Sequence, residues 1–203
     1  LLAVLSVAVL SIPTALAEGT PEAQVKGWTK VTQSVHENGG KIFLQLWHCG
    51  RISHPKFHDD EKPLAPSAVN PNTQAYTQDG FEDTVEPQAM SIADIKQTVL
   101  DFKHAAENAK NANFDGVEIH SSNGYLIHQF FNKNSNIRTD DYGGNIQNRA
   151  RFFFEVLEAV SEVWPENRIG VRMNPSLNDA FGITATEETI PTFDYIIEKL
   201  NAY

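Results

Sequence analysis

The stretch FDGVEIHSSNGY, residues 114–125, decides the fold of this chain of 203 residues. An apolar run that ends at Ile119 is typical of a buried strand, and His120, Asn123 and Tyr125 follow it directly. Parallel α/β barrels present their active-site side chains at the carboxyl ends of strands in this way. The stretch therefore predicts a buried parallel strand that leads into a functional site.

Amphipathic helices are expected on both sides of this strand. Apolar residues recur at helical spacing in four segments, of which the second has Ile95, Phe102 and Ala106 on its apolar face. The N-caps are expected at Thr20, Ser91 and Thr186. The third helix is expected from Ile146 until Pro165, which ends it.

Short apolar segments between these helices predict the strands. They cover residues 41–47, 114–120 and 168–174. Strands that alternate with helices imply right-handed βαβ units and a parallel sheet, and hence an α/β fold. A proline-rich excursion over residues 54–88 interrupts the pattern, and loops of this length commonly form lids or substrate walls.

The parity of polar residues along the strands points to a lumen. Side chains alternate between the two faces of a strand, and each predicted strand has one aliphatic face. The other face carries Gln45, Glu118, His120, Arg172 and Asn174. A parallel sheet covered on both faces is apolar on both, so these side chains are expected to face a barrel lumen and its mouth. A buried structural ion pair between Glu118 and Arg172 is the alternative for those two residues.

Composition restricts the class of partner and compartment. The chain has 16 Lys and Arg against 26 Asp and Glu, a net charge of −10, which argues against nucleic acid as a partner. Cys49 is the only cysteine, so no intrachain disulfide can form. This suits a reducing, cytoplasmic compartment. We expect the lone thiol to be buried or half-buried and inert.

The first 17 residues differ from the rest of the chain. Residues 1–12 are almost wholly apolar, and Ala15 to Ala17 resemble a signal-peptide cleavage site. A basic n-region is missing, and the run is short for a membrane span. We interpret residues 1–17 as a signal-like leader or an artefact, with a fourth strand as an alternative. The signal-like pattern leaves secretion or organelle targeting open against the cytoplasmic assignment.

Seven histidines raise the alternative of a metal-dependent hydrolase. No His-x-His or His-Glu-x-x-His spacing occurs among them, although such spacings are typical of zinc sites. We therefore expect no metal site.

Four motifs together resemble one known family. They are QLWH at 45–48, FDGVEIHSSNGY at 114–125, SNIRTDDYGGNIQNRARF at 135–152 and RIGVRM at 168–173. In this order they closely resemble the old yellow enzyme family of FMN-dependent ene-reductases. The resemblance implies a TIM barrel that binds FMN at its carboxyl-terminal mouth, with NADPH or NADH as reductant. The implied substrate is a small α,β-unsaturated carbonyl or nitro compound, and neither nucleic acid nor a membrane is expected as a partner of the folded domain.

The resemblance also assigns the catalytic roles. His120 and Asn123 match the pair that donates hydrogen bonds to the carbonyl or nitro oxygen of the substrate, an oxyanion-hole role. Tyr125 matches the proton donor, and a phenol with a pKa near 10 can protonate a carbanion-like centre while it stays neutral at pH 7.

Cofactor and scaffold roles follow from the same resemblance. Gln45 matches the glutamine at the pyrimidine edge of the flavin, and Arg172 the arginine that stabilises the reduced flavin. Trp47 matches an aromatic of the substrate pocket. We expect Arg149 and Arg151 to form scaffold ion pairs.

The resemblance implies an incomplete barrel. A (β/α)8 barrel of this type has eight strands and about 250 residues, whereas three to four strands are expected here. Residues 18–203 are therefore interpreted as an incomplete FMN-binding barrel domain, which alone would hold FMN weakly or not at all. Unpaired sheet edges favour self-association. They also leave open that the chain is a non-catalytic assembly module.

Overall fold

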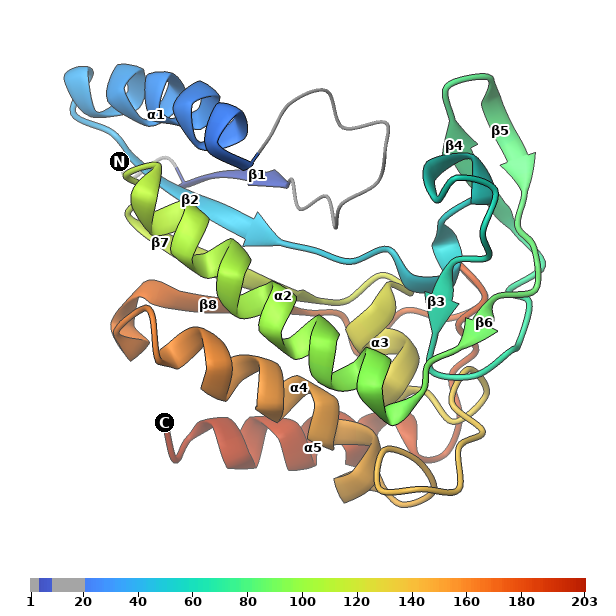
Figure 1. The fold of residues 1–203 in the computed structure, drawn as a ribbon. Coiled ribbons are helices and arrows are strands. Elements are labelled where there is room, and N and C mark those ends of the chain that lie inside the picture. Colours follow the sequence, from blue (N-terminus) through green and yellow to red (C-terminus); the bar gives the residue numbers. More distant parts are fainter. Residues whose placement is uncertain (1–3, 9–20) are drawn as a thin grey trace.

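The computed structural model describes residues 4–8 and 21–203. Within them, one parallel sheet forms the centre of the fold, in the strand order β1-β2-β7-β8. Its strands are β1 (Val4–Ala8), β2 (Lys41–Leu46), β7 (Gly116–Ser121) and β8 (Ile169–Met173). Figure 1 shows these strands fanned side by side, which confirms the predicted parallel α/β arrangement.

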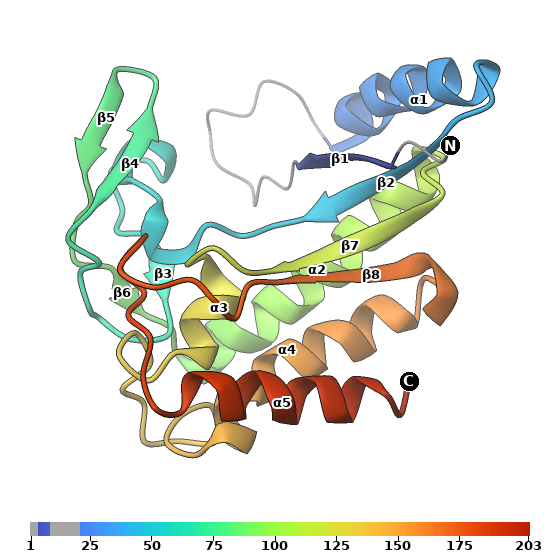
Figure 2. The ribbon, with the colours of Figure 1, turned by 180° about the vertical axis from the view of Figure 1, so that it is seen from behind.

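The α-helices lie between and after these strands along the chain, with two of them between β7 and β8. They are α1 (Pro21–Glu37), α2 (Ile92–Asn111), α3 (Leu126–Phe131), α4 (Ile146–Ser161) and α5 (Thr189–Leu200). Helices α2 and α4 pack along one face of the sheet, and none of the described helices lies across the opposite face (Figure 2). The short helix α3 is a structural feature that helical periodicity did not predict, because six residues are too few to display a period.

Strand β1 falls in the segment interpreted as a leader. Val4–Ala8 pairs in parallel with β2, with Val4 opposite Lys41 and Ala8 opposite Gln45. The alternative of a fourth strand is therefore the one the structure adopts for these five residues. The other residues of the 1–17 segment, and the N-cap expected at Thr20, lie outside the described residues.

Helix α2 begins as its capping signal predicts. The Ser91 hydroxyl accepts a hydrogen bond from the Asp94 backbone N–H at 3.1 Å, and the Asp94 carboxylate accepts one from the Ser91 N–H at 2.7 Å. This reciprocal pair satisfies two N–H groups that a helix start leaves open.

The prediction for the start of the last helix was wrong. Helix α5 begins at Thr189, with Glu188 at its N-cap position, and not directly after Thr186. The Thr186 backbone N–H donates to the Thr189 hydroxyl at 2.8 Å, and the Thr186 hydroxyl accepts from the Glu188 N–H at 3.3 Å. Thr186 therefore organises a turn that precedes the helix.

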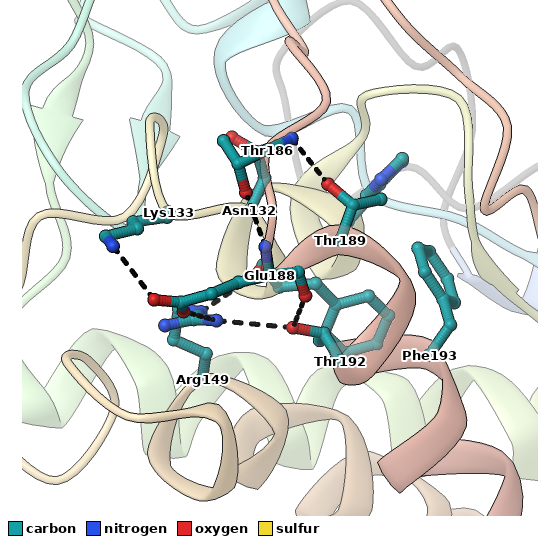
Figure 3. Close-up of a pocket in the computed structure, with 10 residues that line it drawn as sticks. Asn132, Lys133, Arg149, Thr186, Glu188, Thr189, Thr192 and Phe193 are labelled. Carbon is teal, nitrogen blue, oxygen red and sulfur yellow. Dashed lines mark hydrogen bonds and ion pairs between the residues drawn. The ribbon is translucent and has the colours of Figure 1, made fainter.

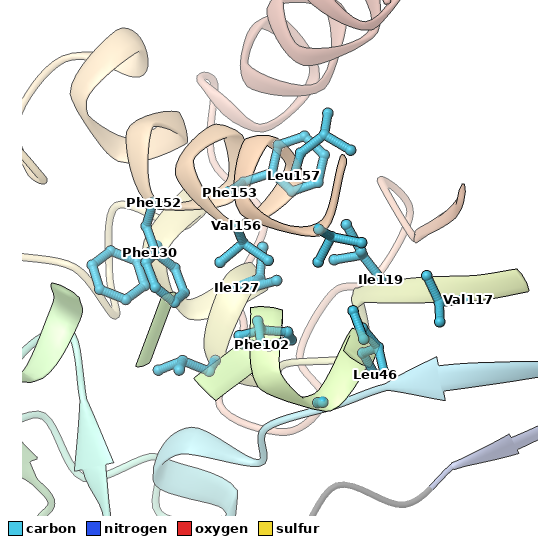
Figure 4. Close-up of a cluster of buried hydrophobic side chains, with 14 of the residues drawn as sticks. Leu46, Phe102, Val117, Ile119, Ile127, Phe130, Phe152, Phe153, Val156 and Leu157 are labelled. Carbon is cyan, nitrogen blue, oxygen red and sulfur yellow. The ribbon is translucent and has the colours of Figure 1, made fainter. Parts of the chain in front are cut away.

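The aliphatic faces of the strands form the core, as parity predicts. Ile42, Leu46, Val117 and Ile119 are fully buried. They belong to one cluster with apolar residues of α2, α3 and α4, among them Phe102, Ile127, Phe130, Phe152, Phe153 and Val156 (Figure 4). The helix side of the sheet is thus sealed, and the polar side chains are left on the other face.

The excursion over 54–88 contains structure of its own. Strands β3 (Leu64–Ala65) and β6 (Gln88–Ala89) form a parallel pair, and β4 (Gln74–Thr77) and β5 (Gly80–Asp83) form an antiparallel hairpin. The hairpin stands beyond the carboxyl ends of the central strands (Figure 1). It is tied down by Lys56, whose ammonium lies 2.6 Å from Asp79 and 2.6 Å from Glu82. The excursion therefore walls one end of the sheet.

A buried arginine on α4 connects this helix to α3 and to the residue before α5 (Figure 3). The Arg149 guanidinium donates to the Phe131 carbonyl at 2.9 Å, to the Gly144 carbonyl, and to Glu188 at 2.7 Å. The expected scaffold ion pair of Arg149 is confirmed. For Arg151 the expectation was wrong, because its guanidinium donates to the Asp141 carbonyl and to Asn148 and pairs with no carboxylate of the described residues.

Candidate active site

The turn after β7 places the predicted catalytic residues. His120 lies near the end of the strand, and Asn123 and Gly124 follow with positive φ angles of 56° and 81°. Two successive left-handed residues reverse the chain, so that Tyr125 stands directly before α3. Gly124 also has no room for a side chain, since a Cβ there would lie 2.7 Å from the Cβ of Phe181.

Three aromatic side chains meet beside this turn. The ring of Trp47, just past β2, lies 4.6 Å from the ring of Tyr125 and 5.8 Å from that of His120. The rings of His120 and Tyr125 are 5.3 Å apart. The structure therefore brings together residues that are 78 positions apart in the sequence, as expected for adjacent strand ends in a parallel sheet.

His120 is held in its neutral form. Its side chain is 5% exposed, and burial together with the positive charge of Arg172 lowers the pKa of the imidazole to about 4. Its Nδ1 lies 3.4 Å from the Ser122 hydroxyl. Nε2 has no hydrogen-bond partner among the described residues and is available to a ligand.

Asn123 and Tyr125 also have groups that can donate a hydrogen bond to a ligand. The Asn123 side-chain oxygen accepts a hydrogen bond from the Asn174 amide at 3.1 Å, which leaves the Asn123 NH₂ group free to donate. Burial raises the pKa of Tyr125, with a smaller contribution from Cys49. The phenol is therefore a protonated donor at neutral pH.

The open face of the sheet carries a second polar layer. Gln45 stands opposite Glu118 in the register of β2 and β7, and its side-chain amide donates to the Glu118 carboxylate. The alternative of an ion pair between Glu118 and Arg172 is wrong, because β8 places Arg172 opposite His120 and Gly170 opposite Glu118. Arg172 is exposed and makes no ion pair with another described residue.

The donors on this face suit a planar heterocycle rich in acceptor atoms. Arg172 offers an unpaired guanidinium, and Gln45 retains its amide oxygen and a second N–H. The indole Nε1 of Trp47 is buried without a hydrogen-bond partner among the residues described. The ring system of FMN is such a heterocycle, so the residues present fit this cofactor.

A cleft of about 430 Å³ opens next to Tyr125. Its walls come from the β2 exit loop and the β4–β5 hairpin, and its aromatic lining comprises Trp47, Phe57, Tyr76, Phe81, Tyr125 and Phe181. Apolar, aromatic walls with a few polar groups are typical of small-molecule sites. Phe181, whose ring stacks at 6.2 Å on that of Tyr125, has no signal in the sequence, since it lies in a loop without periodicity.

His48 and Cys49 also line this cleft. Burial lowers the pKa of His48 to about 4, with a smaller effect of His58, and burial raises the pKa of the Cys49 thiol to about 11. The thiol is therefore protonated and unreactive at neutral pH, as the sequence predicts.

Two features were sought in the part of the chain that the structure describes, a cluster of metal ligands and a membrane-spanning helix. In the described part of the chain, no three His, Cys, Asp or Glu side chains gather as metal ligands. None of the helices described there is long and apolar enough to cross a membrane.

The profile of one protein family matches nearly the whole chain. It is the NADH:flavin oxidoreductase / NADH oxidase family, and it matches residues 19–203. The chain therefore belongs to the NADH:flavin oxidoreductase / NADH oxidase family. The resemblance to old yellow enzymes is confirmed.

Individual relatives agree with this family. The chain is 44% identical over 153 residues to flavin oxidoreductase hxnT of Emericella nidulans, covering 75% of this chain and 39% of the relative. It is 35% identical over 196 residues to 12-oxophytodienoate reductase 2 of Arabidopsis thaliana, covering 92% and 52%. The chain thus spans about half the length of the curated relatives it matches.

Solved structures show the same relationship in space. Morphinone reductase in complex with tetrahydroNAD superimposes with a TM-score of 0.83 at 41% identity, covering 88% of this chain and 51% of that protein. The old yellow enzyme homologue from Zymomonas mobilis also gives a TM-score of 0.83, at 35% identity and with coverages of 89% and 51%. The predicted partial TIM barrel is confirmed, with four strands among the described residues.

Proposed function

We propose that this chain carries the active site of an FMN-dependent ene-reductase. In this proposal NADPH or NADH is the reductant, and the substrate is a small compound with a C=C bond activated by a carbonyl or nitro group. The observation that carries the proposal is the convergence of His120, Asn123 and Tyr125 beside a polar sheet face on which Arg172 is unpaired.

Arg172 and Gln45 are the residues of this chain that would hold the flavin. Bound FMN would supply hydride chemistry, which protein side chains lack. Arg172 contributes a fixed positive charge to the site, and Gln45, steadied by its bond to Glu118, contributes a directional amide.

His120 and Asn123 bind the substrate oxygen in this mechanism. A neutral imidazole N–H and an amide N–H both strengthen their hydrogen bonds as negative charge develops on a carbonyl or nitro oxygen. The low pKa of His120, about 4, keeps the imidazole neutral at pH 7. Such a neutral donor needs no counter-charge in a buried site.

Tyr125 supplies the proton to the α-carbon. Its phenol stays protonated because burial raises its pKa, and its ring is confined by Trp47 and Phe181 on neighbouring loops. A confined donor loses little orientational freedom when the substrate arrives.

The names of relatives support this choice of reaction. A probable flavin mononucleotide-dependent alkene reductase of Leishmania infantum is 42% identical over 191 residues, covering 87% of this chain and 50% of the relative.

The proposal also covers self-association of the chain and its location in the cell. Strands β1 and β8 each pair with one neighbour in the described sheet, and unpaired strand edges are templates for another chain. We propose self-association through these edges and a cytoplasmic location. Sedimentation at rising concentration and cell fractionation test the two points, and a constant monomer mass would contradict the first.

The experiment that tests the function is the flavin absorbance of the protein with FMN kept in excess, because this chain alone is expected to hold FMN weakly. We expect NADPH or NADH to bleach the flavin band without oxygen faster than in a protein-free control, and a small enone to restore the band. Bleaching without restoration by any enone or nitroalkene would contradict the ene-reductase assignment. A matched measurement on Arg172→Gln separates weak flavin binding from a defect in the reaction.

A further inference from the structure

We propose that His128 and Gln129 are positioning residues that clamp the Gly124 peptide and thereby set Asn123 and Tyr125. The clamp itself is independent of the reaction, whereas the consequence for turnover rests on the proposed function. Neither residue faces the cleft: both lie on the short helix α3, and they are 2% and 0% exposed.

The two side chains hold Gly124 from both of its polar atoms. The Gly124 N–H donates to Nδ1 of His128 at 3.2 Å, and the Gly124 carbonyl accepts from Nε2 of Gln129 at 2.7 Å. Asn123 and Tyr125 are the chain neighbours of Gly124 on either side. Fixing this one residue therefore restricts both of them.

The Gln129 amide extends the clamp to the loop after β2. Its second N–H donates to the Cys49 carbonyl at 3.1 Å, and its oxygen accepts from the Arg51 N–H at 3.2 Å. Gly50 makes room for it, because a Cβ at Gly50 would lie 2.2 Å from the Gln129 amide oxygen. This loop begins at Trp47. One buried amide therefore fixes the position of the loop that carries Trp47 relative to the loop that carries Tyr125.

The clamped turn uses left-handed backbone at two successive residues. Asn123 has a positive φ of 56°, which asparagine adopts more readily than most residues but less readily than glycine, so contacts that hold Gly124 also help to fix this conformation. The bond from Gly124 needs an unprotonated Nδ1. Burial, with a contribution from His120, lowers the pKa of His128 to about 4, so the acceptor is present at neutral pH.

The sequence offers isolated NMR reporters for the two halves of the clamp. Gly124–Tyr125 is the only Gly–Tyr pair of the chain, so ¹³C-carbonyl glycine with ¹⁵N-tyrosine labels the Tyr125 amide alone. Asn–Gly occurs only at 38–39 and 123–124, so the matching label reports Gly124, with Gly39 as an internal control.

We expect each variant to move its own reporter. Gln129→Met removes the donor to the Gly124 carbonyl and shifts the Tyr125 signal. His128→Leu removes the acceptor and shifts the Gly124 signal, and His128→Asn restores it, because the asparagine oxygen can take the place of Nδ1. The Gly39 signal stays in place throughout.

Asn136→Leu is the control for a merely structural loss. Asn136 is also a buried amide, 3% exposed, and its NH₂ group donates to the carbonyls of Phe130 and Tyr142. We expect it to lower the melting temperature as Gln129→Met does, while both reporters keep their positions.

Turnover supplies the second readout. In the FMN-loaded protein, Gln129→Met and His128→Leu are expected to lower kcat about 10- to 100-fold, since small misplacements at a reacting centre have effects of this size. KM for the nicotinamide is expected to stay within about twofold, and His128→Asn to recover kcat.

Unchanged reporters in Gln129→Met and His128→Leu overturn the clamp. Shifted reporters with normal kcat overturn its effect on catalysis. If either variant fails to fold, Gln129→Glu decides, because it keeps the acceptor for the Arg51 N–H and loses the donor to the Gly124 carbonyl, so an unmoved Tyr125 signal in this variant overturns the clamp. The reporters can respond in the variants as expected while the wild-type protein has no reductase activity. That result refutes the proposed function and leaves the clamp intact.

Discussion

Arg172 stands directly opposite His120 in the register of β8 and β7, and its charge helps to keep the imidazole neutral. The two residues are 52 positions apart and come from adjacent strands. The cation that would stabilise an anionic cofactor thus also tunes a donor for the substrate. Burial makes the larger contribution to the low pKa of His120, and Arg172 adds to it.

Arg172→Gln is expected to raise the pKa of His120 above about 4 while leaving it below 6.5, because burial persists. The titration of the His120 ring protons by NMR measures the shift. Arg168→Gln is the matched control, since this arginine donates to the Asp115 carbonyl at the opposite end of β8. A pKa that does not move in Arg172→Gln would contradict the electrostatic coupling.

Acid is expected to destabilise the fold below pH 6.5. The pKa values of His48, His120 and His128 are each lowered to about 4, mainly by burial. Above pH 6.5 these groups are neutral in both states. Between pH 6.5 and 4 the unfolded chain binds protons that the folded chain excludes, so stability falls by up to about 1.4 kcal/mol per pH unit for each histidine.

Urea unfolding at pH 7.5 and pH 5 measures this slope. His128→Asn removes one of the three histidines. It is expected to reduce the slope of stability against pH by up to about 1.4 kcal/mol per pH unit, the contribution of one proton. A stability that is equal at the two pH values would refute the assignment of buried neutral histidines.

Tyr125→Phe is expected to separate the two halves of the proposed reaction. Reduction of the flavin by the nicotinamide stays, whereas reoxidation by an enone slows about 10²- to 10⁴-fold, the usual contribution of a general acid. Stopped-flow absorbance follows both halves. Tyr142→Phe is the control, because the Tyr142 hydroxyl donates to Glu155 at 2.9 Å and does not line the cleft. Equal reoxidation rates in the two variants would exclude Tyr125 as the proton donor.

Arg149→Met is expected to lower the free energy of unfolding by about 3 kcal/mol, since it leaves the buried Phe131 carbonyl without its donor and also removes the bonds to the Gly144 carbonyl and to Glu188. Arg151→Met, two residues further along α4 and on its exposed face, is expected to change it by less than about 0.5 kcal/mol. Denaturant titration of both variants gives the comparison. Similar losses would mean that the Arg149 cluster is no more important than a surface contact.

Much of the site could be predicted because the signals are local. The apolar run before His120 and the capping box at Ser91 depend only on the period of a strand and on the first turn of a helix. The same holds for the parity that puts Gln45, Glu118 and Arg172 on one face. One error was local, because the Thr186 hydroxyl and N–H organise a turn with Glu188 and Thr189 instead of a helix start. The other arose between distant strands, because Glu118 pairs with Gln45 instead of Arg172.

The sequence by itself determined the alternation of strands and helices, the buried face of each strand, and which side chains follow β7. These properties follow from chain geometry over a few residues. Only the tertiary structure decided that Arg172 lies beside His120, that Phe181 stacks on Tyr125 and that Gln129 holds Gly124. Such contacts depend on strand register and on loops that return from far along the chain, and no local period encodes them.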